Sequence, residues 1–440
     1  MKFYFAMNLK KIFLFLLTLT ATLTLFSQGG ANTIYSQYGM GMLYPHQFGR
    51  SFGMGNTGYA ISDNLTLNSF NPASVADLHY TTFDVNVVSN TFQSKDGVNT
   101  PSQYTDASLG TIAIGTPLLK NWGAMLGLTP FSSMGYSVKA LSTDAVAGNG
   151  VDYYKGFGGI NALFFGTGYR YKSLSVGAKA TYLFGSFNQQ KLRVFDNAAY
   201  FNAFKDQQYG VFDFTFDFGA QYRIKFNDNA QLTFGAVYGL QQNLNAEYSV
   251  TSFLTTQNTI SDPMSGSGIK AIVENTSENP ASLALTLPAY IGGGLAYKYR
   301  DKLTLALDYK QQDWSVFQIN SGSYTVGSNY NFGAEYIPNK NSVGNENYHK
   351  RIAYRFGLCY QKLPLEINAE SINDLSATIG FSFPLRKFKF ERELFGSAIN
   401  FGVQAGRRGA TNNSLVQDNY IKLNLGFTLN DKWYIKRKFD

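Results

Sequence analysis

The sequence predicts an all-β fold: a transmembrane antiparallel β-barrel of about 14 strands with an N-terminal plug in its lumen. Three observations support this prediction: the composition, the long segments in which apolar and polar residues alternate, and a glycine-rich region before the first such segment. Aromatic residues make up 16% of the 440-residue chain and charged residues only 15%, whereas soluble domains contain about 25% charged residues. The hydrophobic content of 44% is ordinary for a folded protein, which argues against a disordered chain and a helical membrane protein.

The N-terminus has the pattern of a signal peptide. Two lysines precede an apolar run over residues 12–26, and small residues follow the run. We assign residues 1–28 to the signal peptide and expect cleavage between Ser27 and Ala31. A signal anchor is the alternative, but the run is shorter than the roughly 20 residues that a membrane-spanning helix needs.

Long alternating segments predict the barrel wall. In the clearest one, aromatic residues at even positions from Phe212 to Tyr222 alternate with polar residues such as Asp213 and Asp217, so the two kinds of side chain lie on opposite faces of a strand. In lipid, only helices and closed barrels satisfy all backbone hydrogen bonds, and we therefore expect a closed barrel over residues 80–430. The predicted strands span residues 80–92, 105–116, 121–140, 153–171, 173–189, 207–226, 230–249, 284–300, 302–319, 324–337, 349–362, 374–384, 395–408 and 417–430.

A soluble β-sandwich or propeller is the alternative interpretation, and segment length argues against it. Predicted strands such as 153–171 and 207–226 are far longer than the usual 5–6 residues or so. A barrel of about 14 strands is too wide for side chains alone to fill. We therefore assign the glycine-rich residues 32–79, which precede the first strand, to a plug inside the lumen.

Short motifs in the plug and the later strands resemble a known family. Asn71-Pro72-Ala73 precedes the first predicted strand, and Asp308-Tyr309 is followed by Trp314-Ser315 in an Asp-Tyr-x4-Trp-Ser pattern. Further similar stretches are Leu287-Pro288, Gly292–Tyr297, Gly333–Pro338 and Tyr354–Gly357. Their order and spacing resemble the long-chain fatty acid transporter (FadL-like) family of outer-membrane barrels over most of the mature chain.

This resemblance implies a fourteen-stranded barrel in the cell outer membrane, with a plug or hatch in which Asn71, Pro72 and Ala73 take part. It also implies uptake of small hydrophobic, fatty-acid-like compounds past the plug and through a lateral opening at a kink in the third strand. Pro130 cannot donate to a β-ladder, and Gly127 and Gly135 flank it in that strand. We therefore expect the lateral gate at these three residues; an ordinary bulge without a passage is the alternative.

One feature of such transporters is missing from the motifs. A fatty-acid-like ligand needs a basic partner for its carboxylate, and the sequence does not assign one. By strand parity, the basic residues that face the lumen include Lys179, Arg223, Lys298 and Lys310.

The alternative function is therefore a non-transporting structural or adaptor subunit of an outer-membrane assembly or secretion complex. Protein partners would bind the long loop 250–283 on one side of the membrane. On the other side they would bind the basic C-terminal tail, residues 431–440, through its segment 432–438.

No pattern predicts catalysis, a metal site or a cofactor. The histidines His46, His79 and His349 lack metal-site spacing, and no local signature places a nucleophile beside one of them. The single cysteine, Cys359, allows no disulfide framework. The net charge of +8 is dispersed along the chain, which does not imply nucleic acid. We expect outer-membrane lipid and a hydrophobic small molecule as partners; a polar-solute porin and a barrel enzyme are lesser alternatives.

Overall fold

The computed structural model describes residues 33–44, 48–97, 101–144, 148–260, 268–277, 281–317, 323–342, 346–390, 393–413 and 415–431. The predicted signal peptide, residues 1–28, and the tail segment 432–438 lie outside the described residues. The loop 250–283 lies partly outside them.

The strands form a closed antiparallel β-barrel of fourteen wall strands, which confirms the predicted fold class. The ring closes where the last strand pairs with the first wall strand, from Gln417↔Lys95 to Asp431↔Thr81. The wall consists of β2 (Thr81–Lys95), β3 (Ser102–Leu119), β4 (Trp122–Asp144), β5 (Gly148–Tyr171), β6 (Leu174–Phe195), β7 (Asn202–Asn227), β8 (Ala230–Gly239), β9 (Gln242–Thr255), β10 (Ile269–Asn275), β11 (Ala281–Leu287), β12 (Tyr290–Tyr299), β13 (Leu303–Asp313), β14 (Ser323–Tyr324), β15 (Val326–Tyr336), β16 (Ala353–Ile367), β17 (Glu370–Phe390), β18 (Glu393–Arg408) and β19 (Gln417–Asp431).

Interruptions explain why there are more strand segments than wall strands. β8 and β9 continue one another along β7, with a break at Leu240 and Gln241. β10, β11 and β12 follow one another along β9 and β8, and β14 and β15 both pair with β16. The remaining short strand, β1 (Met42–Leu43), belongs to the N-terminal segment.

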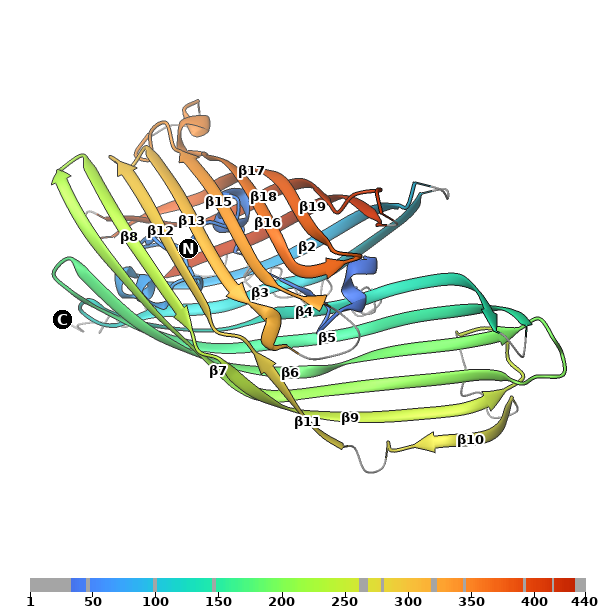
Figure 1. Cartoon of the computed structure of the whole chain (residues 1–440). Helices are drawn as coiled ribbons and strands as arrows, with labels where there is room; N and C mark the ends of the chain where they lie inside the picture. Colours follow the sequence, from blue (N-terminus) through green and yellow to red (C-terminus); the bar gives the residue numbers. More distant parts are fainter. Residues whose placement is uncertain are drawn as a thin grey trace, which may run out of the picture.

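The two ends of the barrel differ. At one end, here called the turn end, tight turns join the strands at residues such as Asn121 (φ 63°) and Lys172 (φ 54°). Toward the opposite loop end, strands β4 to β7 run for 22 to 26 residues. Their loop-end parts, together with β9, β10 and β11, form an extension that we call the wing. Figure 1 shows the wing diverging from β2 and β3 and reaching well past the barrel.

The wing revises the predicted loop boundaries. The interval 141–152, which separates the predicted strands 121–140 and 153–171, is mostly strand, because β4 ends at Asp144 and β5 begins at Gly148. The interval 250–283 contains the end of β9, all of β10 and the start of β11. Alternation alone does not predict these extensions, since apolar and polar residues do not follow a sustained two-residue period in them.

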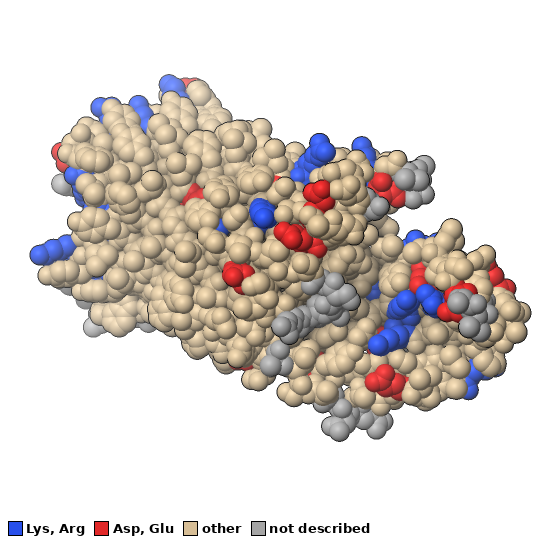
Figure 2. All heavy atoms as spheres, in the orientation of Figure 1, with Lys and Arg blue, Asp and Glu red and all other residues tan. Residues whose placement is uncertain are grey.

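Side chains on the wall follow the predicted alternation. Phe212, Phe214 and Phe218 are each about half exposed on the outer face, whereas Thr215 and Asp217 are buried on the inner face. Figure 2 shows a surface that is largely uncharged through the middle of the barrel, with Lys, Arg, Asp and Glu gathered toward the strand ends and over the wing. No helix among the described residues is long and apolar enough to cross a membrane.

The N-terminal segment lies inside this wall. Its helix α2 (Gly49–Gly53) packs on β16 to β19, and its 3-10 helix η3 (Pro72–Asp77) packs on β3 to β7. A further 3-10 helix, η2 (Ile34–Gln37), packs on β4. Residues 48–80 thus contact two separate groups of wall strands near the turn end; their role as a plug remains a prediction.

Candidate functional site

A belt of inward-facing glycines seats the plug. A Cβ atom on Gly235 would lie 2.0 Å from the Tyr59 carbonyl oxygen, and one on Gly357 would lie 2.1 Å from the Gly55 nitrogen. Such distances exclude any side chain, so the plug backbone lies directly on the wall. The wall glycines whose Cβ would come within 3.0 Å of atoms of residues 48–80 are Gly115, Gly123, Gly168, Gly177, Gly219, Gly235, Gly292, Gly294, Gly333, Gly357, Gly380 and Gly402.

The predicted hatch residues lie on this belt. Asn71 is fully buried, and its Nδ2 donates to the carbonyl oxygens of Tyr59 (2.8 Å), Ala220 (3.1 Å) and Ala236 (3.3 Å). Its Oδ1 accepts from the Ala73 nitrogen at 3.0 Å, which caps η3, and Pro72 begins that helix. Asn71 therefore joins two parts of the plug to the wall.

Asp308 of the Asp-Tyr-x4-Trp-Ser motif also holds the plug. Its Oδ2 accepts from the backbone nitrogens of Gly58 (2.6 Å) and Tyr59 (3.0 Å). The motif residue therefore fixes the same plug turn that rests on Gly235.

Two ionic networks complete the attachment. The Arg50 guanidinium pairs with Asp63 of the plug at 3.1 Å and with Glu335 of the wall at 2.6 Å, and Glu335 also pairs with Arg355 at 2.8 Å. Burial alone would raise the pKa of Asp63, but the positive charge of Arg50 holds it well below its ordinary value. In the second network, Asp77 at the end of η3 pairs with Arg170 and Arg223.

The wall has a seam between β3 and β4. Their ladder runs from Leu119↔Trp122 to Ile112↔Leu128, and beyond it the described residues of these two strands form no ladder. β2–β3 and β4–β5 pairing both continue toward the loop end. Each strand therefore has one unpaired edge along the seam.

Of the three predicted gate residues, two lie at this seam. Pro130 follows the last β3–β4 pair and causes a register shift against β5. Gly135 lies farther along the unpaired edge of β4. Gly127, by contrast, is still paired with Ala113, and its Cβ would lie 2.5 Å from Phe164, so core packing explains this glycine. A gating role for these residues remains a prediction.

The N-terminal segment occupies part of the seam. β1 pairs antiparallel with β4 through Met42↔Ser133 and Leu43↔Ser132. Next to this pairing, the Tyr44 nitrogen donates to the Phe131 carbonyl oxygen at 2.9 Å. β1 thus lies on the unpaired edge of β4 immediately after Pro130.

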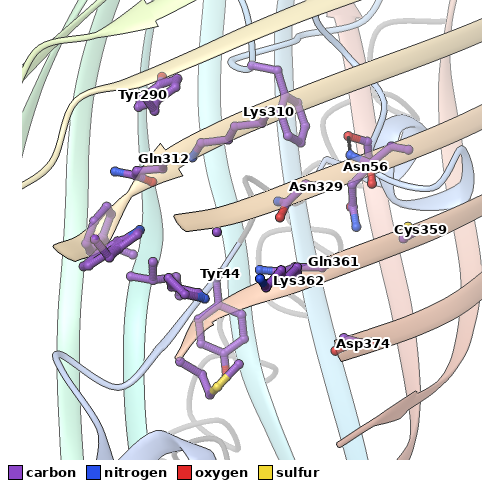
Figure 3. A pocket seen from close by; sticks show the side chains of 18 of the residues that line it. Tyr44, Asn56, Tyr290, Lys310, Gln312, Asn329, Cys359, Gln361, Lys362 and Asp374 are labelled. Atoms are coloured by element: carbon purple, nitrogen blue, oxygen red, sulfur yellow. Dashed lines mark hydrogen bonds between the residues drawn. The ribbon is translucent and has the colours of Figure 1, made fainter. Parts of the chain in front are cut away.

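A cavity of about 230 Å³ in the lumen reaches this point. Part of its lining is apolar: Leu43 of β1, Pro130 and Phe131 at the seam, Leu287 of the wing, and Trp314. Another part is charged. Its cations come from five different strands, and two carboxylates, Asp217 and Asp374, line the cavity with them; the cations are Lys179, Lys310, Lys362, Arg408 and Lys422. Figure 3 shows the Lys310 and Lys362 side chains beside this common space.

The four lysines differ in their partners. Lys179 pairs with Asp217 at 3.1 Å. The Lys310 ammonium lies 4.1 Å from the centre of the Tyr290 ring, and Lys422 lies 5.0 Å from that of Tyr420. Within the part of the chain that the structure describes, neither Lys310, Lys362 nor Lys422 forms an ion pair with a carboxylate. Arg408, the remaining cation of the lining, pairs with Asp374 at 2.8 Å. The three lysines are therefore the lining cations that have no ion pair among the described residues.

The other lumen-facing cations predicted by parity have structural roles. Arg223 binds Asp77 of the plug, and Lys298 pairs with Asp301 at 3.0 Å at the turn end. Lys179 and Lys310 line the cavity, whereas Arg223 and Lys298 do not. The sequence could not show this difference, because strand parity gives the face on which a residue lies but not its height along the barrel.

Comparison with known proteins gives both a family and a fold. A family model described as BamG matches residues 8–440. The chain belongs to the BamG family. No curated protein sequence matches it.

Solved structures with the same fold as this BamG-family chain are FadL-like channels, which confirms the resemblance seen in the motifs. A Pseudomonas aeruginosa FadL homologue is 13% identical, with 89% of this chain and 99% of that chain covered and a TM-score of 0.56. The Ralstonia pickettii toluene transporter TbuX is 14% identical (88% and 98% covered, TM-score 0.53). The CymD monoaromatic hydrocarbon channel is 16% identical (88% and 97% covered, TM-score 0.51).

In this BamG-family barrel, the inner face of the wing is apolar and already covered. Phe187, Tyr209 and Leu244 of the wing pack with Trp314 and Phe317. Met40 of the N-terminal segment joins the same cluster, and Leu43 packs against it. Trp314 belongs to the Asp-Tyr-x4-Trp-Ser motif and begins η4 (Trp314–Val316). The second half of the motif therefore fills the wing, while Asp308 holds the plug.

Proposed function

We propose that this BamG-family barrel lies in the outer membrane and mediates uptake of small hydrophobic or amphiphilic compounds, with the β3–β4 seam as the lateral opening. One observation carries the proposal: the cavity that contains the cationic side chains is also lined by Pro130 and Phe131 at the seam. The names of the solved relatives, which include a toluene transporter and a monoaromatic hydrocarbon channel, support the same class of compound.

The cavity lining favours an amphiphilic anion, such as a long-chain carboxylate. Apolar side chains beside the seam suit a hydrocarbon chain, because burying apolar surface stabilises the complex by about 25 cal/mol per Å². Lys310 lies in the same lining without a described carboxylate partner, so it can bind a headgroup. This arrangement supplies the basic partner that the sequence did not assign.

The plug residues Asn71, Pro72 and Ala73 serve in this proposal as a seal that stays seated. Passage through the plug would have to break the buried contacts of Asn71 and the close packing on the glycine belt. Lateral exit avoids this cost, because an apolar ligand enters the lipid directly. We expect β1 to yield instead, since it is held to β4 by a pairing of only two residues.

The test is accumulation of a labelled long-chain carboxylate in cells whose only such barrel is this chain. Pro130→Val restores a backbone donor at the seam, and we expect slower uptake with the folded barrel retained. Pro101→Val, at an exposed position next to β3, is the matched control. Equal uptake by wild type and Pro130→Val would exclude the seam as the route, and no uptake by wild type would exclude the function.

The wing supports a second candidate function, the structural or adaptor subunit. It extends past the barrel (Figure 1) and carries exposed apolar residues, including Leu141 (87% exposed), Ile272 (66%) and Val273 (68%). Burying such side chains against another protein would be favourable, because it removes apolar surface from water. Gentle extraction from the native membrane should then yield a fixed ratio of this barrel to another protein, whereas a lone barrel with bound ligand favours uptake.

A further inference from the structure

We propose that the loop-end part of the seam binds an extended segment of a second protein, which pairs as a β-strand with the edge of β4 beyond Gly135, where no described residue pairs with it. This inference does not depend on uptake. The site lies beyond β1, in a cleft of about 240 Å³ between the two unpaired edges. It is lined by Ser102 and Tyr104 of β3 and by Tyr136 to Lys139 of β4. Thr33 and Ile34 of the N-terminal segment line the end next to Gly135, and the remaining lining residues are Ser94, Asp96 and Val416.

The lining identifies the cleft as a strand edge. Tyr136, Ser137, Val138 and Lys139 are consecutive in β4 and all line the cleft. Neighbouring side chains of a strand point to opposite faces, so a cleft that contacts all four runs along the edge of the strand. An edge of this kind offers unpaired backbone donors and acceptors to an added strand.

The direction of the free backbone groups follows from Gly135. Its nitrogen donates to Ser36 Oγ at 3.0 Å, and its carbonyl oxygen accepts from the Thr33 nitrogen at 3.0 Å. β4 pairs with β5 without a register shift from Ser132 onward. Backbone groups alternate in direction along a strand, so those of Ser137 and Lys139 also point into the cleft, and those of Leu141 point the same way beyond it.

β1 shows that this edge accepts an antiparallel strand. It pairs with β4 in that direction immediately before the cleft. β3 and β4 are antiparallel to each other, so one added strand cannot be antiparallel to both. We infer that the partner segment continues the direction of β1 and pairs with β4.

Side chains along β4 specify the chemistry of that segment. Tyr136 packs against the apolar cluster of the wing, and Val138 lies on the same face. Ser137, Lys139 and Leu141 are exposed on the other face. Cross-strand neighbours stabilise a sheet when they match. The partner segment is therefore alternating, with apolar residues beside Tyr136 and Val138 and with an acidic residue beside Lys139.

Site-specific photo-crosslinking in the native outer membrane tests the proposal. A photoreactive amino acid placed at Ser137, Lys139 or Leu141 of the full chain should crosslink to one partner. The crosslinked partner positions should be spaced two residues apart and run in the opposite order to β4. The control position is Lys205 of β7, which is exposed but paired on both sides with neighbouring strands.

A proline substitution makes the test specific. Ser137→Pro removes a backbone donor that points into the cleft but leaves the β4–β5 hydrogen bonds in place. It should lower the yield of the Leu141 crosslink roughly tenfold, because the partner segment loses a backbone hydrogen bond and meets the proline ring. Ser137→Ala should leave the yield unchanged. Crosslinks without the two-residue spacing, crosslinks to this chain's own residues before Thr33, or equal yields from both variants would overturn the proposal.

Discussion

The turn-end and loop-end halves of this barrel use the same strands in opposite ways. At the turn end, the ladder around the ring is continuous, and the inward side chains are reduced to glycine where the plug rests. Toward the loop end, β3 and β4 separate after Leu128, and the strands continue as a wing. The difference teaches that the plug is packed as a fixed part of the wall, and our proposals therefore place exchange with lipid or partners in the other half.

At the turn end, the plug backbone packs directly on wall glycines, and we expect this contact to make that half rigid. Any added atom on Gly235 or Gly357 would overlap with plug backbone, and protein interiors tolerate little overpacking. The loop end is held differently, by apolar side chains such as Trp314 and Phe317 that cover the wing. Side chains can change rotamer, so this half permits movement that the glycine belt does not.

Removing Arg50 should have the largest effect at the turn end. Arg50→Gln leaves Asp63 and Glu335 without their shared cation, and breaking a buried ion pair costs about 3–5 kcal/mol. Urea unfolding in detergent measures this loss. Lys120→Gln, at an exposed turn position, should change stability by less than about 0.5 kcal/mol; equal effects of the two substitutions would show that the network is not structural.

The same substitution should change the pH dependence of stability. In wild type, the lowered pKa of Asp63 contributes stability that is present above the ordinary aspartate pKa of about 3.9 and is lost as pH falls through the folded-state value. Without Arg50, burial instead favours the protonated form. We therefore expect the stability difference between wild type and Arg50→Gln to narrow as pH falls from 7 to 4, as measured by unfolding; a constant difference would contradict this.

Adding a side chain to the glycine belt should cause the next largest loss of stability. Gly235→Val places atoms where the Tyr59 carbonyl lies, and overpacking of this kind costs about 3 kcal/mol. Gly293→Val is the control, because a Cβ there has its nearest described neighbour at 3.9 Å. Protease cleavage within the plug should increase for Gly235→Val alone. A plug that stays protected would show that it is not seated on the belt.

A smaller effect is expected from Asn71→Ala. The substitution leaves the carbonyl oxygens of Tyr59, Ala220 and Ala236 without this donor, at a cost of about 1–3 kcal/mol. Unfolding in urea compares it with Asn243→Ala, which removes an exposed asparagine from β9. If both variants lose the same stability, Asn71 does not anchor the plug.

The smallest effect is expected at the loop-end cavity. Lys310→Met should weaken binding of a long-chain carboxylate about tenfold, which corresponds to about 1.4 kcal/mol, while the fold is retained. Titration of the purified barrel with a fluorescent carboxylate measures the affinity. Lys225→Met, an exposed lysine of β7 outside the cavity, should bind like wild type, and unchanged binding by Lys310→Met would remove the lysine from the site.

The alternating segments were enough to predict the wall, because lipid outside and water inside impose a two-residue period on each strand. Phe212 and Asp217 lie on the faces that their spacing predicts. The glycine belt was missed, although a signal exists: inward positions such as Gly177, Gly219 and Gly235 are glycines in successive strands. Recognising it requires the register between strands, which a single sequence does not supply.

The site was predictable only in part, for the same reason. Pro130 marked the place where pairing with β3 ends, since proline has a local effect on hydrogen bonding. The pairing of β1 with β4 was not predictable, because a two-residue strand has no periodicity. The convergence of Lys310, Lys362 and Lys422 on one cavity depends on strand heights, and these follow from the register.

The central claim is that compounds leave through the seam past β1 while the plug remains seated. A reversible disulfide tests it directly: Leu43→Cys with Ser132→Cys joins paired positions of β1 and β4, whose Cα atoms lie within disulfide range in an antiparallel pair, in a background with Cys359→Ala. We predict that the oxidised barrel loses uptake of the labelled carboxylate and that a reductant restores it. Uptake that is the same in the oxidised and reduced states would contradict the account.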